Sequence, residues 1–184
     1  MFFIILLPFA TFAGLSFVTS VALSLSAAIL VTLGLLARDC VSGRSAKAIN
    51  LATVMIYGGF ALGMALTGRD IGATTVRMVL DAGLLLMVLG SIALRAPFTL
   101  QYSREGVAPD VAVRPQFIRV NTVLSWAWAA AFTLMLAADV LALWLPSAPL
   151  WVGLVATFAV RNSAIQFTKW YTGRARDLFS AAPV

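Results

Sequence analysis

The chain has 184 residues, of which 61% are hydrophobic and 11% are charged, and its 13 basic and 7 acidic side chains give a net charge of +6. Because a soluble domain is about half apolar and about a quarter charged, this composition excludes a water-soluble globular domain and predicts a protein embedded in a bilayer. The absence of histidine and the single cysteine, Cys40, exclude histidine-ligated metals and haem, an internal disulfide and a thiolate cluster.

The N-terminal region is apolar throughout, since the first 37 residues contain no charged side chain. That length exceeds one span of about 20 residues and falls slightly short of two. Residues 18–37 predict a span. Residues 2–17, interrupted by Pro8 and Gly14, predict a short segment that crosses the bilayer, re-enters it or lies at its surface. No basic stretch precedes this segment, which argues against a signal peptide.

Four further apolar runs have the length of transmembrane helices. They cover residues 50–67, 74–94, 122–145 and 150–171. The sequence therefore predicts an all-α, polytopic integral membrane helical bundle with five spans and a short N-terminal spanning or re-entrant segment. These segments form a single transmembrane domain over residues 1–184.

The longest polar stretch, residues 95–121, predicts a cytoplasmic loop. Phe98 and Tyr102 suit a membrane surface, so a short interfacial helix is expected early in this loop. Pro109 and Pro115 favour irregular structure after it. On the opposite side, two prolines within residues 145–149 predict a tight hairpin between the last two helices.

Basic residues cluster in three regions that alternate spans place on one side of the membrane. The positive-inside rule puts this side in the cytoplasm, together with the C-terminus. The opposite loops hold only Arg69 and Arg77. The three basic regions contain Arg38, Arg44 and Lys47, then Arg95, Arg104, Arg114 and Arg119, and finally Lys169, Arg174 and Arg176.

Five polar side chains inside the apolar runs form a predicted intramembrane cluster, because ionisable groups at bilayer depth are candidate functional sites. They are Arg77, Asp81, Asp139, Arg161 and Asn162. The aspartates lie about 10 Å from the outer helix ends and Arg161 about 16 Å deep, at about 1.5 Å per residue. We expect Arg161 to pair with Asp139 across the hairpin and Arg77 to pair with Asp81 one turn away. Such pairs either fix helix register or line a polar pocket or ion path that opens outward.

Enzyme motifs are absent: there is no Walker A loop, histidine–carboxylate pair or cluster of acids for a metal. The sequence predicts a protein that is not an enzyme, with no catalytic residue, no cofactor and no metal. The positive charge is attributed to cytoplasmic loops and not to nucleic-acid binding. Gly59 and Gly63 form a GxxxG pattern, which favours close packing inside the chain and leaves a homo-oligomer open.

Short motifs along most of the chain resemble one known family. They include Leu7-Pro8 in the apolar opener, Arg95-Ala96-Pro97-Phe98 after the fourth run, Asn121 followed by Trp126-Ala127 and Phe132, and Trp144-Leu145-Pro146 before the last run. This arrangement resembles the intracellular septation protein A family of bacterial inner-membrane proteins. It departs from the family pattern at Ala96, where a basic residue is usual, and at Asp139, where Asn is common.

The resemblance implies a non-catalytic, multi-pass protein of the bacterial inner (cytoplasmic) membrane that supports septation and envelope integrity. Its partners would be membrane lipids and other inner-membrane proteins of division or cell-wall synthesis. The cytoplasmic loop is the expected surface for partners or anionic lipid. Its contact residues are Tyr102, Arg104, Arg114, Phe117 and Arg119.

The residues are also compatible with two other functions. A small channel or transporter would use Asp81, Asp139 and Arg161 in a polar vestibule that faces outward. A lipid- or quinone-binding membrane subunit would use the aromatic side chains of Trp126, Trp128 and Phe132.

Overall fold

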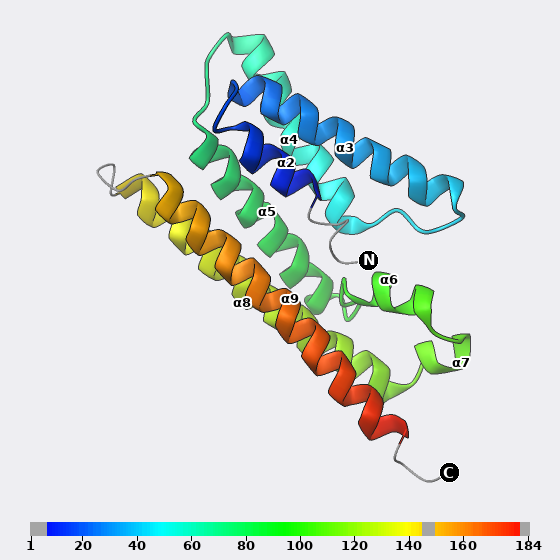
Figure 1. The fold of residues 1–184 in the computed structure, drawn as a ribbon. Helices are drawn as coiled ribbons and strands as arrows, with labels where there is room; N and C mark the ends of the chain where they lie inside the picture. The colour runs from blue at the N-terminus through cyan, green and yellow to red at the C-terminus, as the bar shows by residue number, and fades with distance from the viewer. Residues whose placement is uncertain (1–6, 145–149, 181–184) are drawn as a thin grey trace.

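The computed structural model describes residues 7–144 and 150–180, and every regular element in these ranges is helical. Figure 1 shows a bundle of long helices with short helical segments at one end. In chain order the elements are α2 (Leu7–Leu15), α3 (Val21–Val41), α4 (Ala48–Thr67), α5 (Ala73–Ala93), α6 (Leu100–Ser103), the 3-10 turn η1 (Arg104–Gly106), α7 (Pro109–Ala112), α8 (Pro115–Trp144) and α9 (Leu150–Ser180).

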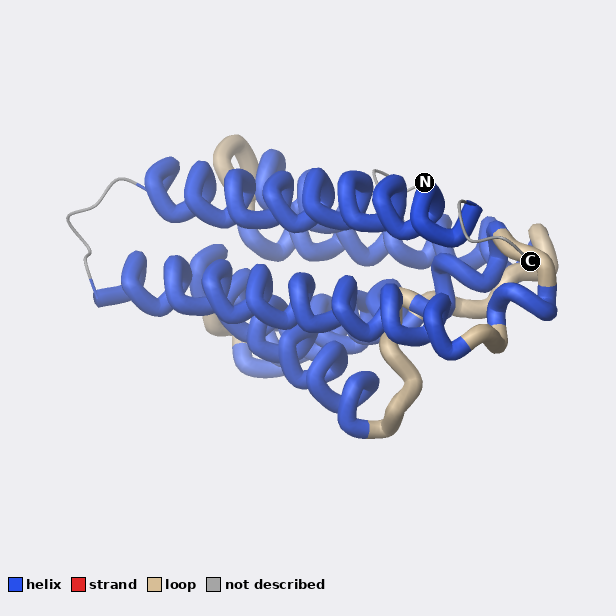
Figure 2. The backbone as a smooth tube through the Cα atoms, turned by 90° about the horizontal axis from the view of Figure 1, so that it is seen from below, coloured by secondary structure: helices blue, strands red, loops and turns tan. Residues whose placement is uncertain are grey.

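Helix α5 joins the two halves of the bundle, because it packs against α4 on one side and against α8 on the other. The first half contains α2, α3 and α4, and the second contains α5, α8 and α9 (Figures 1 and 2). The α3–α4 connection, the α6–α7 region and the end of α9 all lie at one end of the bundle (Figure 1). The three basic regions therefore share one side, as the cation pattern predicts.

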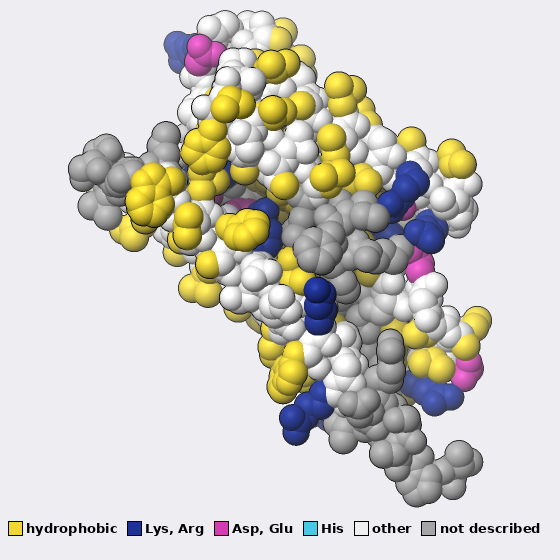
Figure 3. Space-filling model, viewed as in Figure 1, with side chains coloured by type: hydrophobic (Ala, Val, Ile, Leu, Met, Phe, Trp, Pro, Cys, Tyr) yellow, Lys and Arg dark blue, Asp and Glu magenta, His cyan; other side chains and the backbone are white. Residues whose placement is uncertain are grey.

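Within the described residues, four helices are long and apolar enough to cross a membrane: α3, α4, α5 and α8. Their outward faces carry large apolar side chains, such as Leu30, Met55 and Leu86, each at least 69% exposed. Figure 3 shows such side chains spread over the visible face of the bundle. In water this surface would be unfavourable, so the chain is a multi-pass membrane protein.

The first segment contains a short helix. α2 has nine residues and is about 13 Å long at about 1.5 Å per residue, less than half of the roughly 30 Å hydrocarbon core. It packs against α3 and buries Phe9 and Phe12. The described part of this segment therefore packs against the bundle and is too short to cross the bilayer. Residues 2–6 of the predicted segment lie outside the described residues, as do residues 145–149, where the hairpin was predicted.

The loop predicted at residues 95–121 is shorter and more regular than expected. It contains α6, η1 and α7, in partial agreement with the predicted short helix. Helix α8 begins at Pro115, seven residues before its predicted start. Pro109 and Pro115 each open a helix, where the missing backbone N–H and the fixed φ are well tolerated. Interpreting both prolines as loop signals was therefore wrong.

A tight turn at the end of α5 redirects the chain toward α8. Arg95 has a φ of 55°, and the N–H of Ala96 donates to the carbonyl of Ser91 over 2.9 Å. This is the left-handed helix ending that glycine usually supplies. The side chain of Ser91 then accepts the N–H of Phe98 over 3.1 Å. Phe98 and the short α6 are thereby positioned against α8.

Close helix approach occurs at Gly83 and not at the GxxxG pair. A Cβ atom on Gly83 would lie 2.5 Å from Cδ1 of Ile56 on α4, whereas a Cβ on Gly59 or Gly63 would meet nothing within 4 Å. The GxxxG glycines therefore make no close packing contact within the described chain, contrary to the sequence interpretation.

This difference leads to a first prediction. Gly83→Leu should lower the free energy of unfolding by about 1–3 kcal/mol, because the larger side chain overpacks the α4–α5 contact. Gly63→Leu is the matched control, since it lies in a helix with open space around it. Unfolding in mixed micelles, followed by circular dichroism, compares the two variants. Equal stability of both variants would contradict the packing assignment.

Candidate functional site

The intramembrane cluster contains two ion pairs that link different helices. Arg77 on α5 donates from Nη2 to Oδ1 of Asp139 on α8 over 3.1 Å. Arg161 on α9 lies with Nη2 at 3.9 Å from Oδ1 of Asp81 on α5. Asp139 is completely buried. The four charges therefore balance, and each pair connects α5 to another helix.

The predicted pairing was wrong in both parts: Arg161 does not pair with Asp139, and Arg77 does not pair with Asp81. The cause is the position of α5, which packs against α8. Asp139 is on the face of α8 that α5 covers, so Arg77 reaches it directly. Neither the depth of a residue nor its i,i+4 spacing shows how a helix is rotated about its axis relative to its neighbours.

Asn162 does not join the cluster. It is exposed on α9, whereas its neighbour Arg161 is half-buried. Successive residues on a helix point about 100° apart, since a turn takes 3.6 residues. Asn162 therefore points away from the cluster, and including it there was wrong.

Two cavities adjoin Arg161. The outer cavity, which lies nearer the start of α9, has a volume of about 110 Å³ and lies between α2, α4, α5 and α9. The inner cavity, which lies nearer the end of α9, has a volume of about 60 Å³ and lies between α2, α4, α6, α8 and α9. Phe9 and Arg161 line both. Asp81 and Arg77 line the outer cavity with Arg161, whereas Asp139, which was also placed in the predicted vestibule, does not line it.

Two of the aromatic residues singled out in the sequence line the inner cavity. Trp128 and Phe132 are buried and their ring centroids lie 5.8 Å apart. Trp128 donates from Nε1 to Oγ1 of Thr168 over 3.2 Å, which joins α8 to α9. Trp126 is 54% exposed and does not line either cavity.

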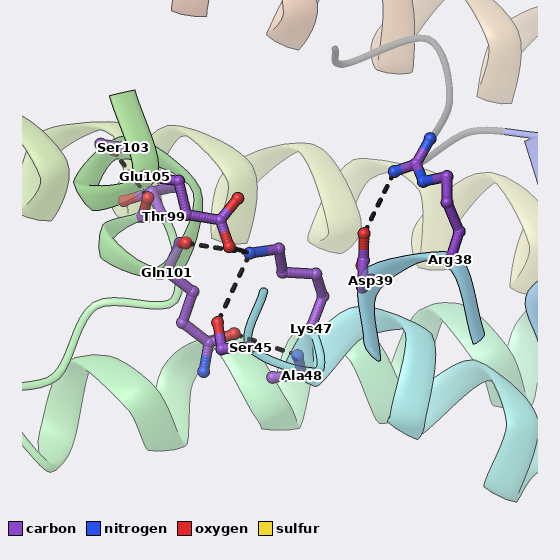
Figure 4. A network of polar contacts seen from close by, with 9 residues as sticks. All are labelled: Arg38, Asp39, Ser45, Lys47, Ala48, Thr99, Gln101, Ser103 and Glu105. Carbon is purple, nitrogen blue, oxygen red and sulfur yellow. Dashed lines mark hydrogen bonds and ion pairs between the residues drawn. The ribbon is translucent and has the colours of Figure 1, made fainter. Parts of the chain in front are cut away.

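A second polar cluster, at the basic end, was missed by sequence reasoning (Figure 4). Lys47, whose side chain is 4% exposed, pairs with Glu105 and donates to the carbonyl of Gln101 over 3.2 Å. The side chain of Gln101 accepts the N–H of Ala48 over 3.0 Å. Lys47 had been counted as an ordinary cytoplasmic charge, and only its burial identifies it as a structural residue.

These contacts make the α6–α7 region a folded cap. Asn121 on α8 holds its other side, because its carbonyl accepts the hydroxyl of Thr99 over 2.8 Å and its side chain accepts the hydroxyl of Ser103. The cap, residues 97–112, is therefore tied to both α4 and α8.

The cap determines which predicted contact residues are available. Arg104, Arg114 and Arg119 are exposed, and Arg114 forms an exposed ion pair with Asp110 at 2.9 Å. Phe117 is half-buried. Tyr102 lines the inner cavity, and its hydroxyl is buried without a hydrogen-bond partner among the described residues. Tyr102 therefore faces the interior, unlike the exposed arginines.

Tyr102 leads to a prediction about pH. Burial raises the pKa of Tyr102 above its usual range, and the carboxylates of Asp39 and Glu105 raise it further. The folded state therefore keeps this proton above pH about 10, where an unfolded tyrosine releases it. The associated stability is fully present below that pH and is lost as pH rises toward the folded-state pKa.

Tyr102→Phe should consequently show a shallower loss of stability above pH about 10. At neutral pH the variant should equal the parent or exceed it by about 1 kcal/mol, because an unpartnered buried hydroxyl is removed. Unfolding free energies measured from pH 7 to 11 test both points. An unchanged alkaline slope would contradict the assigned environment.

Groups of three or more acidic or cysteine side chains suited to a metal are absent from the described residues. Comparison of the chain with protein-family models, with curated proteins and with solved structures gives no match. The resemblance to the intracellular septation protein A family therefore stays a prediction from the sequence.

Proposed function

We propose that this is a non-catalytic inner-membrane protein that supports cell septation and envelope integrity through contacts with other membrane proteins. In this proposal α9 forms a fifth span beside α8, and the basic end and the C-terminus lie in the cytoplasm. The length of α9, 31 residues, and its packing against α8 support this topology. The family resemblance supports the cellular role.

One observation carries the proposal: the cytoplasmic loop is a folded cap and not a free linker. Buried Lys47 ties it to the start of α4, and Asn121 ties it to α8. Arg104 is therefore presented on a fixed surface, and Arg114 and Arg119 follow it in the chain. A preformed surface with exposed arginines suits partner proteins or anionic lipid because little ordering entropy is lost on binding.

The test is site-specific photo-crosslinking in native bacterial membranes. A photoreactive residue at Arg104 or Arg119 should capture proteins of division or cell-wall synthesis. A probe at Leu30, which is 69% exposed on α3, is the lipid-facing control. Capture of lipid and abundant membrane neighbours alone, at cap and control positions alike, would refute the proposal.

A small transporter is a second candidate, favoured by the outer cavity that Arg77, Asp81 and Arg161 line. In purified liposomes, solute flux above that of empty vesicles should then fall in Arg161→Ala. Flux indistinguishable from empty vesicles would remove this candidate.

A further inference from the structure

The two cavities lie in series along α9, with Arg161 between them. Lining residues of the outer cavity begin at Leu154 and those of the inner cavity end at Thr172. At about 1.5 Å per residue, these positions are about 27 Å apart, close to the thickness of the hydrocarbon core of about 30 Å. The Arg161 guanidinium lies 4.7 Å from the centroid of the Phe9 ring, a cation–π contact at the junction.

The outer cavity is lined by two cations and one acid, Arg77, Arg161 and Asp81. Asp139 lies behind the wall, where it is completely buried and pairs with Nη2 of Arg77. However, Nε of Arg77 is buried without a hydrogen-bond partner among the described residues. The Arg161–Asp81 contact is long, at 3.9 Å. The unpartnered donor of Arg77 and the loosely paired Arg161 both suit a bound anionic group.

The inner cavity differs, because beyond Arg161 most of its walls are apolar and, apart from the Tyr102 hydroxyl, its hydroxyl groups are already hydrogen-bonded. Phe98, Leu124 and Ile165 are buried around it. The hydroxyl of Thr168 donates to the carbonyl of Ala164 over 2.8 Å and accepts from Trp128. From Arg161 to Thr172 the cavity follows α9 for about 16 Å. This elongated apolar space suits a hydrocarbon chain and not a polar head group.

We propose that the two cavities form one binding site for a single-chain amphiphile with an anionic head group. The head group lies beside Arg161 and Arg77 in the outer cavity, and the chain extends past Phe9 into the inner cavity. With the topology proposed above, the head group faces the outer side of the membrane and the chain extends from Arg161 toward the cytoplasmic side. Carboxylate and phosphate heads share the required chemistry. The site does not depend on the partner proteins proposed for the cap, and its test is independent of theirs.

The test uses full-length protein in an uncharged detergent, with binding measured by native mass spectrometry. The probes are dodecyl phosphate, laurate and the uncharged dodecanol. Both anions should bind, and dodecanol should bind at least tenfold more weakly. Shortening the alkyl phosphate should weaken binding by about fourfold per methylene, the ratio expected for about 0.8 kcal/mol of burial. Preference for the phosphate would indicate a lipid phosphate, and preference for laurate would indicate a fatty acid.

Variants separate the two parts of the site. Arg161→Gln should weaken binding of dodecyl phosphate at least tenfold, whereas Arg69→Gln, an exposed cation away from both cavities, should leave it unchanged. Ile165→Trp, which fills the inner cavity, should abolish the dependence on chain length. Asp81→Asn should strengthen binding several-fold, because it removes the acid that competes for Arg161.

The Asp81→Asn result keeps the proposal testable if Arg161→Gln does not fold, since a folding defect weakens binding and does not strengthen it. Equal binding of dodecanol and dodecyl phosphate would overturn the proposal. Unchanged or weaker binding in Asp81→Asn would also overturn it, as would parental affinity in folded Arg161→Gln.

Discussion

Asp139→Ala should lower the free energy of unfolding by about 3–5 kcal/mol, because it leaves the Arg77 guanidinium buried without its partner. The pair joins α5 to α8 at 3.1 Å, and Asp139 is completely buried. Arg77→Met combined with Asp139→Leu should recover most of this loss, since a buried pair replaced by apolar side chains of similar volume is often neutral. Unfolding in mixed micelles measures all three proteins.

A double-mutant cycle then distinguishes the observed pairing from the one that the sequence favoured. Asp139 should couple to Arg77, whereas coupling between Asp139 and Arg161 should be much weaker. The reverse result would show that the helices pack in the arrangement expected from depth alone.

Lys47→Met should release the cap, with a loss of about 2–3 kcal/mol from the charged hydrogen bonds of Lys47. Hydrogen exchange over residues 97–112 should accelerate by roughly 30-fold or more, because local opening becomes easier. The long helices should keep their protection.

Arg114→Met is the matched control for this prediction. Arg114 pairs with Asp110 at 2.9 Å, but the two side chains are 59% and 66% exposed, so its removal should change stability by less than about 1 kcal/mol. If hydrogen exchange in the cap is as slow in Lys47→Met as in the parent, Lys47 does not hold this region.

Much of the fold could be predicted from the sequence. The apolar runs located α3, α4 and α5 to within a few residues, because hydropathy and span length are summed along the chain. The start of α8 was placed too late. Pro115 was interpreted as a loop signal, although a proline in the first helical turn is favourable.

The candidate site could be predicted only as a set of residues. Arg77, Asp81, Asp139 and Arg161 were identified because charges are rare in apolar runs. Their partners depend on helix rotation, so the predicted pairs were exchanged and Asn162 was wrongly included. Lys47 gave no signal at all, because its role arises from burial against Gln101 and Glu105.

The sequence by itself determined that this protein lies in a membrane, where its long helices are along the chain, and that its basic regions lie on one side of the bundle. These properties follow from local composition, which each stretch of chain carries independently of the others. The tertiary structure alone decided that Arg77 binds Asp139, that Arg161 lies between two cavities and that residues 97–112 form a folded cap. Those features depend on how helices distant in the sequence are rotated and shifted against one another, because side-chain contacts form within a few ångströms.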